Sequence, residues 1–232
     1  MTCQYQASAI NQTTRKIGGA TVEKPRSIPP WSLRSHHPFV RWFRESRVVD
    51  EDGLPLPVYH GTPTGGFSEF DPDKLGSRDS GLLGNGFYFA KDKETAKSFT
   101  ATRSRDMQKG KKMVYQVYLR VENPMILSEL TLEDIERGWN AFRTRFGRPP
   151  ATHAEFLEKA KPIIRAKQEG NMIAFARELC HLISPATLAR MLGHDGIFAD
   201  FEGGTIVVFD PCQIKAVDNA GGFCAENPNI YT

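Results

Sequence analysis

Two short segments place side chains capable of chemistry beside glycines at the ends of predicted strands. His60 lies within Val58-Tyr59-His60-Gly61-Thr62, and Tyr88 lies within Gly84-Asn85-Gly86-Phe87-Tyr88-Phe89-Ala90. An imidazole can exchange hydrogen bonds with a ligand, and a phenol ring can stack on a planar group. A single histidine or tyrosine more often packs in a core than binds a ligand. Both segments precede a third strand-like stretch, Ile206 to Lys215, and the three together favour a shared site.

In this order, the three segments resemble the signature motifs of the His-Tyr-Glu class of ADP-ribosyltransferases, which includes diphtheria toxin and the poly(ADP-ribose) polymerases. The Val-Val-Asp-x-x-Gly-x-Pro hairpin at residues 48–55, with the later Phe67 and Phe70, is similar to ADP-ribosyltransferase domains of phage polyvalent proteins and bacterial effectors. The resemblance implies an α+β fold, with an ADP-ribosyltransferase-like split β core and a helical insertion. It also implies that NAD is the substrate that donates ADP-ribose.

The resemblance implies roles for individual residues as well. His60 would hydrogen-bond a ribose hydroxyl on the adenosine side of NAD. The backbone of Gly61 would pair with the nicotinamide carboxamide, because a residue without Cβ lets the backbone approach a ligand. Tyr88 would place its ring against the nicotinamide, with Phe99 as a second stacking aromatic. The other expected NAD contacts are Thr62, Asn85 and Gly86. An Asn between glycines also suits a turn with positive φ, so Asn85 has a purely structural alternative.

The sequence departs from the family at the catalytic carboxylate. A Glu stands at the head of the last strand in the family, and the aligned residue here is Thr205. Threonine cannot serve as the base that deprotonates an acceptor. Glu202 is the candidate replacement, because a turn through Gly203-Gly204 would return its carboxylate to the site; the alternative is a solvated loop acid. Asp200 is a weaker candidate, and Asp210 is expected to cap the strand end.

In the family, this substitution occurs in members that transfer a single ADP-ribose and in members that have lost activity. The sequence therefore predicts a mono-ADP-ribosyltransferase that moves ADP-ribose from NAD to a protein side chain. Two alternatives stay open: a degenerate module that only binds NAD or ADP-ribose, and an NAD glycohydrolase in which water accepts the ribose. The polar leader and the helical insertion point further to a secreted bacterial effector or toxin in a host cytosol; the alternative is a cytoplasmic protein. Ubiquitin, modified at a Thr hydroxyl, is one hypothesis for its host protein substrate.

Composition limits the remaining classes of function. The 232 residues are 40% hydrophobic and 25% charged, as expected for one principal globular domain. The net charge of +3 is too small and too evenly spread to favour nucleic acid as a partner. The basic stretch from Arg103 to Lys112 is expected to be a solvated loop. Neither a metal site nor a membrane span is expected, because the cysteines lack metal-ligand spacing and no apolar run reaches membrane thickness.

Three regions follow one another along the chain. Residues 1–30 are polar and expected to be disordered, which is compatible with a secretion leader. Residues 31–218 form the expected transferase domain, in which helical spacing predicts an insertion over residues 128–192 with N-cap signals at Thr131 and Thr152. Residues 219–232 are expected to be a loose tail. The expected core residues of the insertion are Trp139, Phe142, Phe156, Ile163, Phe175 and Leu179.

Local patterns predict the elements around the insertion. Turn chemistry at Asp52-Gly53 predicts a hairpin, and Pro55 and Pro57 favour an edge strand that ends at Tyr59. A helix is expected over residues 93–100. Further strands are expected over residues 86–90, 113–121, 197–201 and 205–210.

Overall fold

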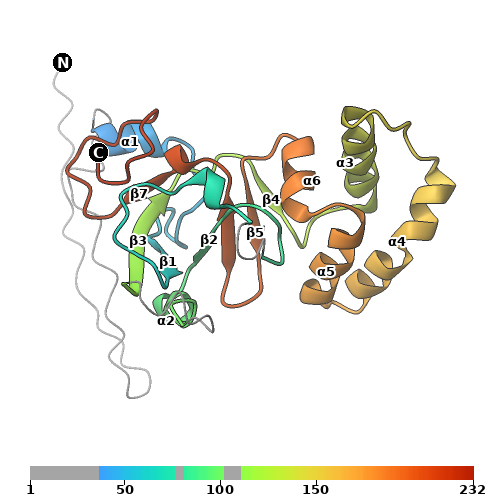
Figure 1. Cartoon of the computed structure of the whole chain (residues 1–232), viewed down its shortest axis with the longest axis horizontal. Helices are drawn as coiled ribbons and strands as arrows, with labels where there is room; N and C mark the ends of the chain where they lie inside the picture. The colour runs from blue at the N-terminus through green and yellow to red at the C-terminus, as the bar shows by residue number, and fades with distance from the viewer. Residues whose placement is uncertain (1–36, 77–80, 102–110) are drawn as a thin grey trace.

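A computed structural model describes residues 37–76, 81–101 and 111–232. The polar leader, residues 1–30, and residues 103–110 of the basic stretch lie outside the described residues. The described chain has a β-sheet toward one end and a group of helices at the other (Figure 1). This arrangement agrees with the α+β fold predicted from the sequence.

Seven strands form one mixed sheet in the order β4-β5-β6-β2-β1-β3-β7. Their bounds are β1 Val58–Thr62, β2 Phe87–Ala90, β3 Met113–Leu119, β4 Pro124–Ile126, β5 Gly196–Ala199, β6 Thr205–Val208 and β7 Ile214–Ala216. Neighbouring strands pair antiparallel except β4 and β5, which are parallel. The stretch from Ile206 to Lys215 thus contributes to two separate strands rather than one, because the 3-10 helix η4 (Pro211–Gln213) interrupts it.

The hairpin before β1 forms, but the edge-strand prediction is wrong. Val49 and Pro55 make an isolated antiparallel bridge, as the turn at Asp52-Gly53 predicts. β1 begins at Val58, after both prolines, and pairs with β2 on one side and β3 on the other. Pro55 and Pro57, which lack an N–H donor, therefore lie outside the β1 ladder. The central position of β1 in the sheet leaves no ladder hydrogen bond unmade at these prolines.

The segment with predicted helical spacing forms four helices, here called the helical unit. They are α3 Leu132–Arg145, α4 His153–Gln168, α5 Met172–Leu182 and α6 Pro185–Met191. Thr131 and Asp134 form a capping box at the start of α3, and Thr152 caps α4 by accepting from the Glu155 N–H. These side chains bind backbone donors that the first helical turn leaves without partners. Outside the unit lie α1 (Pro38–Phe43) and α2 (Lys93–Ser98).

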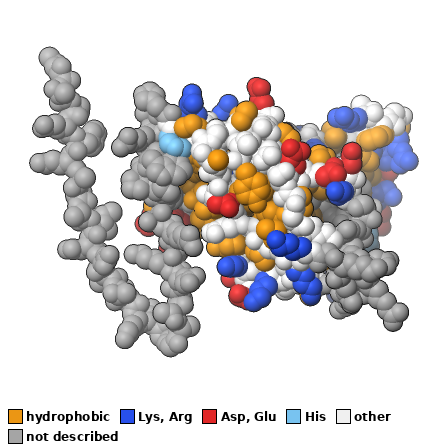
Figure 2. All heavy atoms as spheres, turned by 60° about the vertical axis from the view of Figure 1, so that its left-hand side comes forward, with side chains coloured by type: hydrophobic (Ala, Val, Ile, Leu, Met, Phe, Trp, Pro, Cys, Tyr) orange, Lys and Arg blue, Asp and Glu red, His pale blue; other side chains and the backbone are white. Residues whose placement is uncertain are grey.

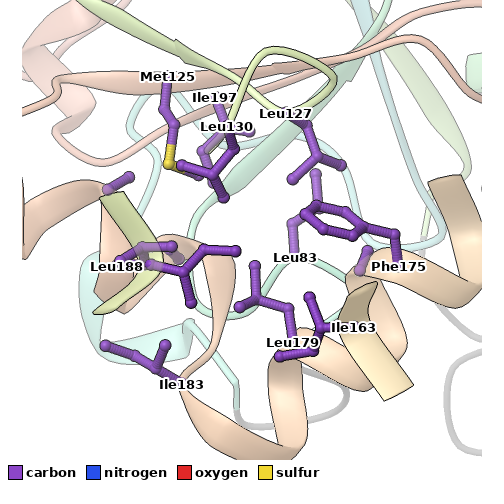
Figure 3. Close-up of a cluster of buried hydrophobic side chains, with 14 of the residues drawn as sticks. Leu83, Met125, Leu127, Leu130, Ile163, Phe175, Leu179, Ile183, Leu188 and Ile197 are labelled. Carbon is purple, nitrogen blue, oxygen red and sulfur yellow. The ribbon is translucent and has the colours of Figure 1, made fainter. Parts of the chain in front are cut away.

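One apolar core joins the helical unit to the sheet. Figure 3 shows Leu179 of α5 and Leu188 of α6 converging with Met125 of β4 and Ile197 of β5. Five of the residues expected in this core are buried: Trp139, Phe156, Ile163, Phe175 and Leu179. The sixth, Phe142, is partly buried. A second core, which includes Val58, Val117 and Ile206, lies among the central strands. The helices are therefore packed on the sheet edge through shared apolar contacts.

The C-terminal segment differs from the expected loose tail. Phe223 is 4% exposed and Ile230 is 0% exposed. Lys215 is fully buried, and its Nζ donates to the carbonyls of Asn227, Asn229 and Thr232 at 2.9, 2.7 and 2.5 Å. A buried ammonium needs such acceptors. Lys215 meets its three acceptors only when the chain folds. The glycine and asparagine content of the tail therefore gives no sign of this packing.

The surface is mixed in character. Figure 2 shows apolar side chains near the centre of one face, with basic and acidic side chains interspersed around them. No helix within the described ranges is long and apolar enough to cross a membrane.

Candidate functional site

A cavity of about 700 Å³ opens between the central strands and the loops that precede β2. Its volume is typical of a site for a small organic ligand. All nine site residues predicted from the sequence line it: His60, Gly61, Thr62, Asn85, Gly86, Tyr88, Phe99, Glu202 and Thr205. The fold thus brings together residues that are up to 145 positions apart in sequence, from His60 to Thr205 (205 − 60).

The cavity lies where β1 and β2 part. The two strands pair at one position, Tyr59 with Ala90, whereas β1 pairs with β3 along its whole length. A continued ladder would place Gly61 opposite Tyr88. The imidazole Nδ1 of His60 instead lies 2.8 Å from the Tyr88 carbonyl oxygen. The His60 side chain therefore hydrogen-bonds the Tyr88 carbonyl at the point where the two strands separate.

His60 is held as a neutral hydrogen-bond acceptor. A carbonyl oxygen only accepts, so Nδ1 carries the proton in the bond to Tyr88. Burial lowers the pKa of His60, and the bond to the Tyr88 carbonyl opposes this effect only in part. The Phe70 and Phe89 rings pack at 5.0 and 5.6 Å from the imidazole. The neutral ring leaves Nε2 with a lone pair, which can accept from a ligand hydroxyl.

Tyr88 is fixed by the loop that precedes its own strand. Its hydroxyl donates to the Gly84 carbonyl at 2.7 Å and accepts from the Leu83 N–H at 3.1 Å. Gly81 lies directly against the phenol, because a Cβ there would come within 2.5 Å of the ring and hydroxyl. Backbone groups of this loop therefore fix the hydroxyl, and the ring also packs against the apolar core of the helical unit.

Gly61 has a packing role that the sequence does not reveal. A Cβ at Gly61 would lie 1.6 Å from the Ala96 carbonyl oxygen, so α2 packs directly on the β1 backbone. Phe99, the C-cap of α2, is 53% exposed where it lines the cavity. Close packing at Gly61 therefore determines where α2 presents this aromatic ring.

Glu202 and Thr205 lie at the turn between β5 and β6. The Gly204 N–H donates to the Phe201 carbonyl at 3.0 Å, and the Thr205 hydroxyl bonds the same oxygen at 3.4 Å. Glu202 has φ 53° and Gly203 has φ 76°, the left-handed pair favoured in tight hairpin turns. A non-glycine residue in this region costs about 1 kcal/mol, and such strain is often found at functional sites. Glu202 is exposed and lines the cavity, whereas Thr205 is only 8% exposed.

The other two carboxylates considered from the sequence lie elsewhere. Asp210 caps η4 by accepting from the Cys212 N–H at 2.8 Å, as expected for a residue at the strand end. Asp200 accepts from the Ser128 hydroxyl at 3.4 Å and does not line the cavity. In the ranges that the structure covers, no group of three or more His, Cys, Asp or Glu residues is placed to hold a metal ion.

Three charged residues of the cavity wall were missed in the sequence. Glu69, Asp71 and Lys74 line the cavity from the loop that leads to β2. Asp71 caps the 3-10 helix η2 (Pro72–Lys74) and lies 3.4 Å from the Lys74 ammonium. The Asp-Pro start of a short helix was a usable local signal, but nothing in the sequence placed it beside His60.

Comparisons with known proteins identify one family. The model of a family described as ADP-ribosyltransferase in polyvalent proteins matches residues 50–223. No curated protein matches the chain. A solved structure described as an anti-CRISPR protein is 20% identical, with 68% of this chain and 90% of that chain covered. Its TM-score of 0.34 is too low to indicate a common fold.

Proposed function

The chain belongs to the family of ADP-ribosyltransferase domains of polyvalent proteins, and from this premise we propose that it is a mono-ADP-ribosyltransferase acting from NAD on a protein side chain. One observation carries the proposal. His60 and Tyr88 are joined at 2.8 Å, imidazole to backbone carbonyl, and both line a cavity of about 700 Å³. The cavity therefore offers a hydrogen-bond acceptor and an aromatic ring to the same ligand.

NAD would bind with its nicotinamide end at Tyr88. His60 Nε2 accepts from a ribose hydroxyl, and the Gly61 backbone, at the level where the β1–β2 ladder has stopped, meets the carboxamide. In the reaction the bond between ribose and nicotinamide breaks, and nicotinamide leaves with the electron pair. Positive charge develops on the ribose, so the enzyme gains most by orienting the dinucleotide and favouring that charge. A nucleophile of the acceptor then forms the new bond to the ribose carbon.

Lys74 is positioned to meet the pyrophosphate. Of the charged lining residues within the described ranges, Lys74 is the cationic one, beside the acids Glu69, Asp71 and Glu202. The pyrophosphate of NAD is anionic, and an ammonium at the mouth of the cavity would exchange Asp71 for phosphate oxygens. We assign Lys74 to this contact.

Glu202 is the proposed base. The acceptor must lose a proton as its nucleophile bonds the ribose, and a carboxylate can take it. Glu202 supplies the carboxylate from a strained turn that lines the cavity. Thr205 occupies the position of the family Glu but keeps its hydroxyl on the Phe201 carbonyl within the same turn. Thr205 therefore acts in this proposal by shaping the turn.

Thr205 also favours a second candidate function. A domain without the family Glu could bind NAD or ADP-ribose with no chemistry and act as an interaction module. A glycohydrolase, in which water is the acceptor, is the third reading. The three readings differ in their products: modified protein, no product, or free ADP-ribose.

The acceptor is proposed on sequence features alone. A polar leader and a helical unit joined to a transferase domain are consistent with a secreted effector that modifies a host protein in the host cytosol. Ubiquitin, at a Thr hydroxyl, is the first target to test. Mass spectrometry of ubiquitin after co-expression should show one added ADP-ribose, and unmodified ubiquitin would remove this target without affecting the transferase proposal.

The central experiment uses labelled NAD with a cell lysate. Wild-type protein should label a protein band, and His60→Ala and Tyr88→Ala should reduce labelling at least about a hundredfold, as for loss of groups that bind and orient the dinucleotide. His153→Ala is the matched control, because His153 is exposed and bonded to Glu136 on the helical unit. Thermal unfolding of each variant checks that the fold is retained.

Two measurements separate the alternatives. Nicotinamide release at the level of the blank, with NAD binding still seen by calorimetry, would establish the interaction module. Release with free ADP-ribose and no labelled protein would establish the glycohydrolase. Labelling that persists in both cavity variants would overturn the assignment of the site.

A further inference from the structure

The loop that fixes Tyr88 is also part of the core of the helical unit. We call residues 81–86 the Tyr88 loop. Leu83, in its middle, is 0% exposed, and its side chain points into the cluster formed by Ile163 and Leu179 (Figure 3). Its carbonyl accepts from the Ala186 N–H of α6 at 2.7 Å, and its own N–H donates to the Tyr88 hydroxyl at 3.1 Å. One residue therefore connects the helices to the phenol.

Arg190 makes a second connection from α6. Its Nη2 donates to the Asn85 carbonyl at 2.9 Å, and its Nη1 donates to the Ala186 carbonyl at 3.4 Å. The guanidinium lies 4.0 Å from the centroid of the Phe209 ring. Arg190 is an exposed residue, and its guanidinium is oriented by stacking on this ring and by its two hydrogen bonds. The Asn85 backbone is thereby fixed between α6 and the end of β6.

The glycines on either side of Asn85 allow this close packing. A Cβ at Gly84 would come within 2.8 Å of the Ser184 hydroxyl, and a Cβ at Gly86 would come within 2.3 Å of Val207 Cγ1. The Tyr88 hydroxyl donates to the Gly84 carbonyl at 2.7 Å. The loop is thus packed closely against α6 at Gly84 and against β6 at Gly86.

We propose that the helical unit positions Tyr88 for its ligand, and that Arg190 is the positioning residue. Arg190 does not line the cavity, so it acts through the Asn85 carbonyl; the preceding residue, Gly84, carries the carbonyl that accepts from the Tyr88 hydroxyl. Preorganising a ring before binding removes an ordering cost from the ligand's affinity. Loss of Arg190 therefore weakens NAD binding more than the chemical step. The identity of the ligand rests on the proposed function; the positioning of Tyr88 does not.

The test compares Arg190→Ala, Arg190→Lys and the control Arg165→Ala in the full chain. Arg165 is an exposed residue of α4, and its Nε lies 2.8 Å from a Glu169 carboxylate oxygen. The Arg165→Ala substitution removes the same charge far from the Tyr88 loop. We expect Arg190→Ala to raise the Kd and KM for NAD about tenfold with kcat changed less than about threefold. Arg190→Lys should be intermediate, because an ammonium still donates to Asn85 but does not stack as a plane. Arg165→Ala should match the wild type.

Hydrogen exchange in the absence of ligand gives an independent readout. Arg190→Ala should raise exchange in peptides covering residues 81–90 and leave α3 and α4 protected as in the wild type. A uniform rise across all peptides would show a merely structural role and overturn the proposal. Unchanged exchange in residues 81–90 would also overturn it, as would an unchanged Kd in a wild type that binds NAD. If the wild type binds no NAD, the proposed function fails, and the exchange result alone decides whether Arg190 positions Tyr88.

Discussion

The cavity and the helical unit use glycine in opposite ways. Around the cavity, added Cβ atoms at Gly61, Gly81 and Gly86 would come within 1.6, 2.5 and 2.3 Å of other atoms. In the helical unit, Gly147 and Gly170 follow the ends of helices with φ of 71° and 66°, and a Cβ at either meets nothing within 4 Å. Gly138 in α3 is an exception, since a Cβ there would lie 2.2 Å from Leu188 Cδ1.

The difference separates two physical needs. At helix ends glycine provides the left-handed backbone that terminates the helix, and the surroundings are open. In the cavity wall glycine allows close contact with a neighbouring backbone or side chain, and the surroundings are filled, although Gly81 also has a left-handed φ of 65°. We therefore expect substitutions in the two regions to separate stability from activity.

The largest expected effect is that of Gly61→Ala. Its Cβ would overlap the Ala96 carbonyl, so α2 must move away from β1, at a cost of about 2–4 kcal/mol. Because α2 carries Phe99, NAD-dependent activity of the remaining folded protein should also fall at least about tenfold. The free energy of unfolding in urea and the rate of nicotinamide release measure the two effects.

Gly170→Ala is the matched substitution in the helical unit. It should lose about 1 kcal/mol from backbone strain alone, with unchanged activity per folded molecule. Full activity in Gly61→Ala, or loss of activity in a folded Gly170→Ala, would contradict the expected separation of stability from activity.

Glu202 extends the comparison between the cavity and the helical unit. It has a left-handed conformation, which in the helical unit is found at glycines, Gly147 and Gly170. Glu202→Gly should therefore raise the free energy of unfolding by about 1 kcal/mol through relief of strain. If Glu202 is the base, the same variant should lower the rate of transfer about tenfold to a hundredfold. Thermal unfolding and the labelling assay measure these opposite changes.

Glu202→Gln separates the carboxylate from the strain. It keeps the side-chain length and the backbone cost, so stability should stay close to that of the wild type while transfer falls as in Glu202→Gly. A Gln variant with full transfer activity would show that Glu202 is a solvated loop acid and that the base lies elsewhere.

The helical unit was predictable because its signals are local. Thr131 and Thr152 begin helices that their own neighbours specify, and the helical spacing of Phe156 and Phe175 gives their burial. β4, with three residues from Pro124 to Ile126, has no recognisable pattern of its own and forms because β5 pairs with it in parallel. Strands that depend on a partner distant in sequence are not specified by local propensity.

The lining of the candidate site was predictable only in part for the same reason. His60, Tyr88 and Phe99 stand in segments with a recognisable order, and all line the cavity. Glu69 and Lys74 come from a long loop, where only the fold determines which side chains face a ligand. The attachment of the Tyr88 loop to α6 through Leu83 and Arg190 was also invisible, because each contact spans about a hundred residues, 103 for Leu83 to Ala186 (186 − 83) and 105 for Arg190 to Asn85.

Substitution of Lys74 should have a smaller effect on NAD binding. It compares an ion pair at the cavity, Lys74 with Asp71, with an ion pair on α4. Lys74→Gln should raise the Kd for NAD about threefold to tenfold and leave kcat unchanged, since an exposed ammonium contributes modestly to phosphate binding. The loss should shrink as salt rises, because salt screens the wild-type contact. Lys161→Gln, which removes the partner of Glu158 on α4, should not change the Kd. Equal Kd values at low salt for the Lys74 variant and the wild type would remove Lys74 from the site.

The smallest effect is the pH dependence that His60 contributes. Because burial lowers its pKa in the folded chain below the ordinary value of 6.5, the unfolded chain takes up the proton first as pH falls. The stabilisation is therefore fully present above pH 6.5 and is lost as pH falls toward the pKa of the folded protein, with a slope of at most about 1.4 kcal/mol per pH unit. Urea unfolding of the wild type and His60→Gln between pH 7.5 and 5.5 should show the steeper loss in the wild type.

The same pKa shift predicts how NAD binding responds to acid. In the proposed complex a ribose hydroxyl of NAD donates to Nε2, so the affinity for NAD should stay constant as pH falls through 6.5 and decline only once the folded imidazole takes up a proton. Calorimetry of NAD binding across this range tests the point, with His60→Gln as a reference that has no titrating group at this position. A midpoint at or above 6.5 would mean that the imidazole is hydrated in the working protein, and the lowering of its pKa by burial would be wrong.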